Sequence, residues 1–302
     1  MAVSEPKAKL MRVALAGWAC ILLAWGSGGC QDRPQRQPVA ATETRLISLV
    51  PAITETLFAI GAGAQLVAVS QYCDRPAEAK LLPQVGTALT PSYEHIARLK
   101  PSLILTETNQ STKSAELQAL APTLELPWLS LSDIVSSTRL LGQRTHHAER
   151  ANALAAELQR ELSAAPPADA PRVLLVLGYT AGSDLAEVWF IRRNSVHGSA
   201  LAAAGGRNAV DEDISGLPRL SLPAVLKLDP DQIIVLVAAK VDERASESAI
   251  IAAWKKLTPL KAVQHGRVAT LEAPEAFGSG PSILQLKPKL KRLIATLRER
   301  EP

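Results

Sequence analysis

SYEHIARLKP at residues 92–101 runs into the apolar segment LIL at 103–105, and SLPAVLKLDP at 221–230 runs into IIV at 233–235. From the serine to the proline, the two copies keep a constant spacing of 129 residues. Each begins with a serine suited to the N-cap of a helix and ends with a proline that stops the helix before a strand. The spacing therefore predicts two similar α/β halves, although a helix, a proline and a strand in this order also occur in α/β proteins without a repeat.

Each half extends this unit into a parallel sheet. The apolar run 46–50 ends at Pro51, a helical stretch begins near Thr54, and glycines close it before the apolar run 66–69. Strand, helix and strand in this order are typical of a parallel sheet. We expect further strands at 103–105 and around Leu129, and a helical stretch from Asp133.

A long helix is predicted between the halves. Apolar positions recur at helical spacing from His147 to Leu162, and a new strand begins at 173–177. We expect an N-terminal lobe at residues 45–145, a connecting helix at 146–166 and a C-terminal lobe at 171–302. A helical connector implies limited relative motion of the lobes.

Composition excludes several classes of protein. The chain has 302 residues, 47% of them hydrophobic and 21% charged, as in a two-domain globular protein and unlike a disordered or collagen-like chain. The formal net charge of +4 is spread along the chain without a dense basic block. We therefore expect no nucleic-acid partner.

The N-terminus carries the features of an export signal. Three basic residues precede the apolar run 13–25, which is shorter than the roughly 20 residues of a membrane span. Small residues then precede Cys30, as in a bacterial lipobox, except that Ser27 stands where leucine is usual. We predict a signal peptide at 1–29, a lipid anchor at Cys30 and a flexible tether at 30–44; the alternative is cleavage near Gly29 that releases a soluble protein.

The cysteines favour a domain without disulfides. Cys20 lies in the signal peptide, so an acylated Cys30 leaves Cys73 alone. We interpret Cys73 as a small packed residue, with a reactive thiol as the alternative.

Four further stretches carry a family resemblance: LVPAITE at 49–55, YCDRP at 72–76, VGT at 85–87 and AAGGRN at 203–208. With the export signal and the twin halves, they resemble the helical-backbone (class III) periplasmic solute-binding proteins of ABC importers for cobalamin, ferric siderophores and haem. The resemblance covers about residues 45–299. It implies an α/β fold of two Rossmann-like lobes with mostly parallel sheets, joined by a single long helix, with a ligand cleft between the lobes.

The resemblance also implies a function and its partners. The chain would be a monomeric, membrane-anchored lipoprotein of the periplasm that captures a metal chelate, cobalamin-like or a ferric siderophore, and delivers it to an ABC permease and ATPase. No resident cofactor or metal is implied. The alternative is an exported enzyme or scaffold that uses the same fold without transport.

By match to the family, the ligand site draws on loops of both lobes. Tyr72 would form the first-lobe wall, and Trp189, with Phe190, the second. The complete predicted set is Tyr72, Thr87, Ala88, Asn109, Trp189, Phe190, Leu217, Phe277 and Ser279. Few rings are available, because only nine aromatic residues follow the signal peptide. Ala88, Thr108 and Leu217 stand near positions where cobalamin binders tend to carry tryptophan, so a smaller or more polar chelate competes with cobalamin.

Permease docking in this family resembles a pair of salt bridges, one glutamate on each lobe. Glu94 matches the first, but the 129-residue repeat places Pro223 at the second position. Glu212 or Asp213, which are close in sequence, would be the acidic residue that substitutes for it. An ordinary solvated glutamate in a first helical turn is the alternative for Glu94.

Enzyme motifs are incomplete. The segment 277–280 has phenylalanine where a nucleophile elbow needs its first glycine. His146 and His147 are adjacent and so point in different directions on a helix. His95, His197 and His265 lack a carboxylate or cysteine at ligand spacing, which leaves open only an axial role towards haem.

Overall fold

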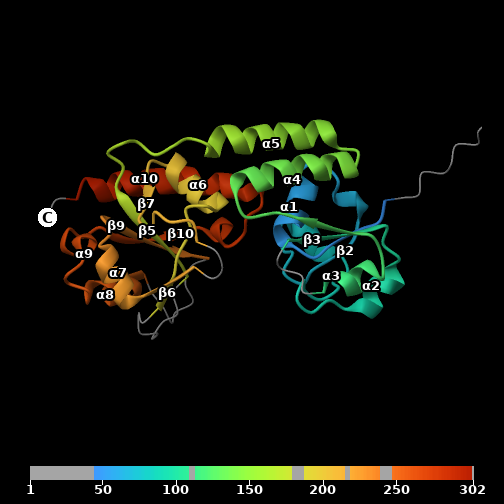
Figure 1. Cartoon of the computed structure of the whole chain (residues 1–302), viewed down its shortest axis with the longest axis horizontal. Coiled ribbons are helices and arrows are strands. Elements are labelled where there is room, and N and C mark those ends of the chain that lie inside the picture. Colours follow the sequence, from blue (N-terminus) through green and yellow to red (C-terminus); the bar gives the residue numbers. More distant parts are fainter. Residues whose placement is uncertain (1–43, 109–112, 179–186, 215–217, 239–246, 301–302) are drawn as a thin grey trace, which may run out of the picture. The chain divides into compact units, whose positions relative to one another are not determined.

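The computed structural model describes residues 44–108, 113–178, 187–214, 218–238 and 247–300. Two four-stranded parallel sheets form its framework (Figure 1). The N-terminal sheet has the strand order β2-β1-β3-β4, and the C-terminal sheet has the order β10-β9-β5-β7. The prediction of an α/β protein with two mostly parallel sheets is confirmed.

The N-terminal sheet consists of short, buried strands. These are β1 (Leu46–Ser48), β2 (Leu66–Val69), β3 (Leu103–Glu107) and β4 (Thr123–Leu126). Alternate residues of β1 and β3 enter different hydrophobic clusters, as the period of two requires. Both faces of this sheet are therefore covered, as is usual for parallel sheets.

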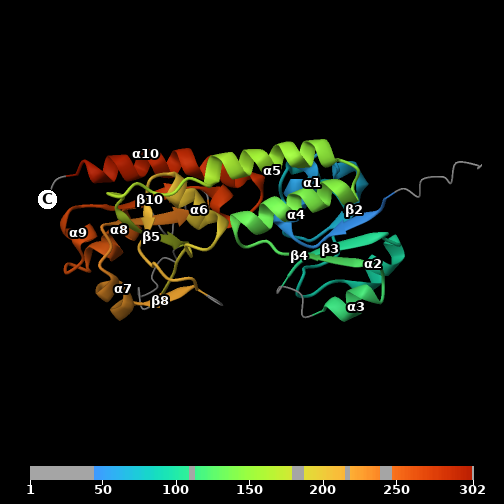
Figure 2. The same cartoon turned by 45° about the horizontal axis from the view of Figure 1, so that its top comes forward.

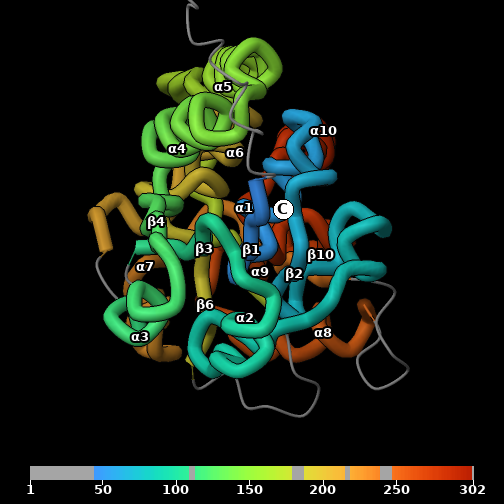
Figure 3. The backbone as a smooth tube through the Cα atoms, turned by 90° about the vertical axis from the view of Figure 1, so that its right-hand side faces the viewer, coloured from blue at the N-terminus to red at the C-terminus, as the bar shows by residue number. Residues whose placement is uncertain are grey.

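Helices of the first half cover the two faces unequally. One face carries α1 (Pro51–Ala59), α4 (Leu131–Arg144) and α5 (Ala148–Leu162). The other carries α2 (Tyr93–Leu99) and α3 (Ser114–Gln118), on the side of the sheet opposite to α4 and α5 (Figure 3). The short 3-10 helices η1 (Gly63–Gln65) and η2 (Ala77–Leu81) lie in the connections.

The C-terminal sheet repeats this plan. Its strands are β5 (Arg172–Leu177), β7 (Arg207–Asn208), β9 (Gln232–Val237) and β10 (Val268–Glu272). On one face lie α6 (Val196–Ala203) and α10 (Leu286–Arg298), which pack against each other (Figure 2). The other face carries α7 (Leu222–Leu228), α8 (Glu247–Lys255) and α9 (Lys261–Gln264). The antiparallel strands β6 (Glu187–Trp189) and β8 (Arg219–Ser221) form a separate ribbon, and η3 (Pro274–Phe277) and η4 (Pro281–Gln285) precede α10.

The helix predicted at 147–162 is confirmed as α5, and it packs along α4. Gly142 belongs to α4, and a methyl group at its Cα would meet Cβ of Ala151 in α5. The absence of a side chain at Gly142 therefore allows the two helices to approach closely. Ser130 begins α4 with a capping box, in which its hydroxyl accepts from the amide of Asp133 at 3.1 Å.

The internal repeat is visible in backbone geometry. Helices α2 and α7 both have seven residues, and each ends on a left-handed residue, Lys100 with φ 47° and Asp229 with φ 42°. A proline follows each of these residues, and a buried strand begins shortly after it. The 129-residue spacing thus relates two equivalent helix–strand units.

Two local predictions need correction. The strand expected around Leu129 lies earlier, at Thr123–Leu126, because Pro127 has no amide hydrogen with which to continue the ladder. Both serines occupy N-cap positions, but only Ser221 accepts a hydrogen bond there, from the amide of Ala224 at 3.4 Å. Ser92 caps its helix without a side-chain hydrogen bond.

One hydrophobic cluster continues from the N-terminal sheet to the C-terminal sheet. It contains residues of α1, α4 and α5 together with residues of α6 and α10.

The predicted limits of the lobes stay predictions. The predicted signal peptide, Cys30 and most of the tether lie outside the described residues, within which no helix has the length and hydropathy needed to cross a membrane.

Candidate functional site

The predicted ligand-contacting residues follow the carboxyl ends of the parallel strands. Tyr72 comes three residues after β2, and Phe277 comes five residues after β10. Trp189 ends β6, whose chain continues through Phe190, which bridges to Val176 in β5. In open α/β sheets the carboxyl edge is where ligands bind, because loops there leave the sheet in different directions.

Hydrogen bonds bring the carboxyl edges of the two sheets to one place. The bridging segment, residues 273–282, follows β10, and three side chains of the first half bind it. Arg75 Nη2 donates to Pro274 O at 2.9 Å, and Trp128 Nε1 donates to Ser279 O at 3.1 Å. Glu55 accepts from the amide of Ser282 at 2.6 Å.

A histidine of the second half holds the same segment. His197, in the first turn of α6, has its Nε2 3.0 Å from Gly278 O. Burial lowers the pKa of His197, and hydrogen bonds to the carbonyl groups of Gly278 and Ala276 oppose that shift. His197 is therefore a half-buried residue whose ring contacts the bridging segment.

In the first half, Tyr72 and Thr87 lie on adjoining loops. The amide of Gln71 donates to Gly86 O at 2.9 Å, which joins the two loops. Thr87 Oγ1 accepts from the amide of Thr90 at 2.9 Å and so fixes a tight turn. Tyr72 is 64% exposed, and Leu89 in this turn is exposed to the same extent. Large exposed apolar side chains at a strand edge suit contact with a ligand.

In the second half, Trp189 and Phe277 are partly exposed, at 40% and 42%. Ser279 is half-buried, and its carbonyl group is already bonded to Trp128. Trp189 lies on the β6–β8 ribbon, and Phe277 ends η3 in the bridging segment. The structure therefore places Tyr72, Trp189 and Phe277 on the carboxyl edges of the sheets with free surface.

Other members of the predicted set differ in their exposure. Ala88 is 7% exposed and Phe190 is 3% exposed, and both belong to hydrophobic clusters. Their side chains have little surface left for a ligand. Phe190 was predicted to line the second-lobe wall of the ligand site, but its ring is buried in the core. Asn109 and Leu217 lie outside the described residues. Thr108, which directly follows β3, is exposed.

Glu107 is a residue at this edge that the sequence reasoning missed. It is the last residue of β3, in register with Leu126 of β4 and on the same face of the strand as Leu105. Burial raises the pKa of Glu107 to about 7. A carboxylate that exchanges its proton near neutral pH thus stands at the carboxyl edge. Its position, two residues after the apolar run 103–105, was the available signal.

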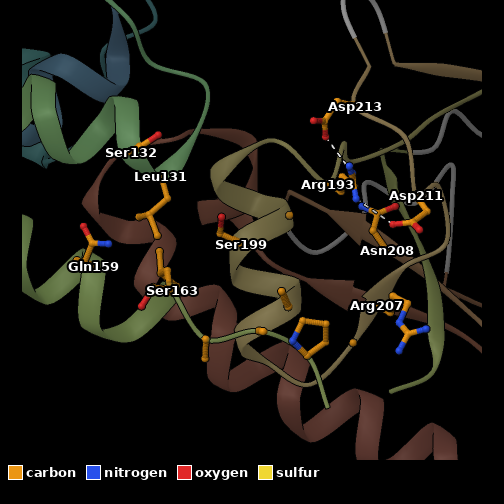
Figure 4. A pocket seen from close by; sticks show the side chains of 17 residues that line it. Leu131, Ser132, Gln159, Ser163, Arg193, Ser199, Arg207, Asn208, Asp211 and Asp213 are labelled. Atoms are coloured by element: carbon orange, nitrogen blue, oxygen red, sulfur yellow. Dashed lines mark hydrogen bonds and ion pairs between the residues drawn. The ribbon is translucent and has the colours of Figure 1, made fainter. Parts of the chain in front are cut away.

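A polar pocket of about 560 Å³ lies elsewhere, between the start of α4, the end of α5, α6 and the residues after β7 (Figure 4). Arg193 projects there between two carboxylates, with Nε 2.9 Å from Asp213 and Nη1 3.0 Å from Asp211. The described ligand-contact candidates do not line this pocket. Arg193 and its two aspartates pair with one another, whereas Arg207 donates to the carbonyl oxygen of Ala168 at 2.9 Å.

The residues considered for docking are exposed and differ in their pairing. Glu94 lies in the first turn of α2 and forms a salt bridge of 2.5 Å with Arg98. Pro223 takes the equivalent position in α7, as the repeat predicts. Asp213 pairs with Arg193, whereas Glu212 is exposed beside it.

Cys73 is buried and free, as expected of a packed residue, and Thr54 Oγ1 lies 3.1 Å from its sulfur. Burial raises the pKa of Cys73, which keeps the thiol protonated. Within the described part of the chain, no three histidine, cysteine or acidic side chains are grouped as a metal site requires.

Comparison with known proteins agrees with this architecture. The family model described as "Periplasmic binding protein" matches residues 46–275. The chain belongs to the periplasmic binding protein family. Family membership implies a location in the periplasm. A vitamin B12-binding protein of Pectobacterium atrosepticum is 31% identical over 208 residues, which are 65% of this chain and 72% of that protein.

Solved structures share the fold of this periplasmic binding protein. The vitamin B12 binding protein BtuF of Vibrio cholerae aligns with a TM-score of 0.67 at 24% identity, over 85% of this chain and 98% of that one. The heme binding protein HutB of Vibrio cholerae aligns with a TM-score of 0.67 at 21% identity, over 85% and 99%. The same two-lobed fold therefore carries different chelates in different proteins.

Proposed function

We propose that this periplasmic binding protein is the substrate-binding lipoprotein of an ABC importer for a metal chelate. Its ligand is a cobalamin-like corrinoid or a ferric siderophore, held where the carboxyl edges of the two sheets meet. The observation that carries the proposal is the exposure of Tyr72, Trp189 and Phe277 at these edges in a member of this family.

Physical chemistry favours a flat, partly apolar ligand. Aromatic rings contribute large contact areas at a low cost in side-chain entropy, and exposed rings of this size otherwise carry a penalty in water. The relatives named as vitamin B12-binding proteins support a corrinoid. The small number of exposed rings supports a ferric siderophore, which needs fewer stacking contacts than a corrinoid does.

Ligand titration tests the proposal. Purified protein is titrated with cyanocobalamin, haemin and a ferric hydroxamate siderophore while tryptophan fluorescence and thermal unfolding are followed. A specific ligand at 100 times its dissociation constant should add about 2.7 kcal/mol to the free energy of unfolding. A protein that binds none of these chelates would contradict the proposal.

Variants then locate the site. Tyr72→Ala and Trp189→Ala should each weaken binding by about tenfold, which corresponds to about 1.4 kcal/mol. Leu226→Ala is the control, since Leu226 is an apolar side chain that is 37% exposed and lies within the helix α7. Equal losses in all three variants would indicate a general effect on folding.

Lipid attachment and transport are tested separately. Cys30→Ala should release the protein from the membrane fraction into the soluble periplasmic fraction without changing ligand affinity.

Glu94→Lys should leave ligand binding intact and reduce uptake of the chelate, because exposed charges at an interface govern the steering and register of docking. Turnover of a chelate by the purified protein would instead favour the alternative of an exported enzyme.

A further inference from the structure

The β6–β8 ribbon presents one polar face next to Trp189. Trp189 and Arg219 are direct cross-strand partners. The next pair along the ribbon is Val188 with Leu220, and Glu187 follows opposite Ser221. Val188 is buried in the hydrophobic cluster of the C-terminal sheet. Because side chains alternate along a strand, Glu187, Trp189 and Arg219 share the opposite, solvent-facing side.

Arg219 covers one face of the Trp189 ring. Its guanidinium carbon lies 4.2 Å from the ring centroid, a cation–π contact. Arg219 Nη1 also lies 3.4 Å from Glu187 Oε2, with side-chain exposures of 45% and 59%. Before a ligand binds, the indole is therefore paired with a cation whose own counter-ion is exposed and loosely held.

This arrangement treats charged and uncharged ligands differently. A flat ligand with an anionic substituent can contact the indole while the substituent replaces Glu187 at the guanidinium. Such a charge-assisted hydrogen bond is stronger than one between neutral groups. An uncharged ligand gains no such bond, and it has to break the cation–π contact if it stacks on the covered face.

We propose that Arg219 makes the site selective for chelates that carry a carboxylate or phosphate group beside a flat apolar surface. This inference rests on the proposed function, because it requires Trp189 to contact the ligand. Arg219 acts as a specificity residue that reads the charge of the ligand, and Glu187 acts as an internal competitor for the same guanidinium.

Two pairs of probes test the selectivity. Cyanocobalamin carries a phosphodiester that dicyanocobinamide lacks, and haemin carries two carboxylates that haemin dimethyl ester lacks. In each pair, the compound with the phosphodiester or carboxylate substituent is called the anionic member, and the compound without it is called the uncharged member. Each is titrated against the wild-type protein, Arg219→Gln, Glu187→Gln and the control Arg298→Gln. Arg298 is an exposed arginine paired with Asp169, on α10.

The expected results differ between the members of each pair. Arg219→Gln should weaken binding of the anionic member by about tenfold and leave binding of the uncharged member unchanged, or strengthen it by up to about threefold. Glu187→Gln should strengthen binding of the anionic member alone, by about twofold. Arg298→Gln should change neither.

The outcomes separate this inference from the proposed function. Equal effects of Arg219→Gln on both members of the pair that binds would overturn the charge selectivity and leave the chelate-binding function standing. Binding of an uncharged member as tightly as its anionic counterpart by the wild-type protein would do the same. If none of these four probes binds the wild-type protein but the ferric hydroxamate siderophore does, the chelate-binding function stands and the charge selectivity is overturned. If the siderophore fails to bind as well, the proposed function is overturned, and the inference with it.

Discussion

At the scale of single residues, the environment of a side chain decides its chemistry. Glu107 and Glu94 are both glutamates of the first half, yet one is partly buried at the end of a strand and the other is exposed on a helix. Burial raises the pKa of Glu107, because desolvation penalises the charged form. Its position on the strand predicts a stability that depends on pH.

Glu107→Gln should stabilise the protein above pH 7. The folded-state pKa of about 7 lies above the ordinary value of 4.5, so the folded state binds the extra proton between these values. The stability linked to Glu107 is therefore complete below about pH 4.5 and falls as the pH rises through 7. Urea unfolding should show a gain of up to about 3 kcal/mol for Glu107→Gln at pH 8 and little gain at pH 5.

The matched control for this measurement is Glu78→Gln, an exposed glutamate of the same half. It should unfold like the wild-type protein at both values of pH. A gain for Glu107→Gln that is the same at pH 5 and pH 8 would show that the carboxylate is not desolvated.

Backbone conformation at single residues gives a second prediction. Lys100→Gly should stabilise the protein by about 1 kcal/mol, because a left-handed conformation costs an ordinary residue energy that glycine does not pay. Asp229→Gly should give no gain, since the Asp229 carboxylate accepts from the amide of Lys261 at 2.8 Å and pairs with its ammonium group at 3.2 Å. Chemical unfolding of both variants checks the difference, and equal gains would contradict it.

At the scale of secondary-structure elements, the antiparallel helices α4 and α5 depend on close approach. A side chain at Gly142 would meet Ala151 and also the His147 carbonyl oxygen at 3.2 Å. Helix propensity alone would favour alanine at this position by about 1 kcal/mol. Packing and propensity therefore make opposite predictions for the same substitution.

Gly142→Ala should destabilise the protein by about 1–2 kcal/mol, because overpacking outweighs the gain in propensity. Ser136→Ala, at an exposed position of the same helix, should be neutral or slightly stabilising. Thermal unfolding of the two variants decides the matter. A Gly142→Ala protein at least as stable as the wild type would mean that α4 and α5 are farther apart.

At the scale of the whole molecule, the bridging segment joins the two halves. Glu55 in α1 accepts from the amide and hydroxyl groups of Ser282, at 2.6 and 3.2 Å. Gly280 lies so close to this carboxylate that an added methyl group would collide with it. Together with the continuous hydrophobic cluster, these contacts limit how far the two halves can move relative to each other.

A double-mutant cycle measures this connection. Glu55→Ala should lower the free energy of unfolding by about 1–3 kcal/mol, because two hydrogen bonds to a carboxylate are lost. Gly280→Ala should be costly in the wild-type background and less so beside Glu55→Ala, since the colliding group is then absent. Strict additivity of the two substitutions in urea unfolding would show that the residues do not interact.

Local sequence patterns were sufficient to predict the order of helices and strands in this protein. Hydrophobic periodicity, prolines and the 129-residue spacing specify the helices, the parallel strands and their repetition, because these depend on interactions between near neighbours in the chain. By match to the family, Tyr72 and Trp189 were predicted in the walls of the ligand site, and both rings have free surface in the structure. Phe190 was predicted beside Trp189, but the structure buries it, since alternation along the chain after β6 turns its ring into the core.

Contacts between residues far apart in the chain could be identified only from the folded structure. The bonds of Glu55 and Arg75 to the bridging segment join residues about two hundred positions apart, and no local pattern encodes such pairs. The raised pKa of Glu107 and the contact between Arg219 and Trp189 have the same origin. Desolvation and ring stacking depend on neighbours that long-range packing supplies, so these properties exist only once the strands have paired.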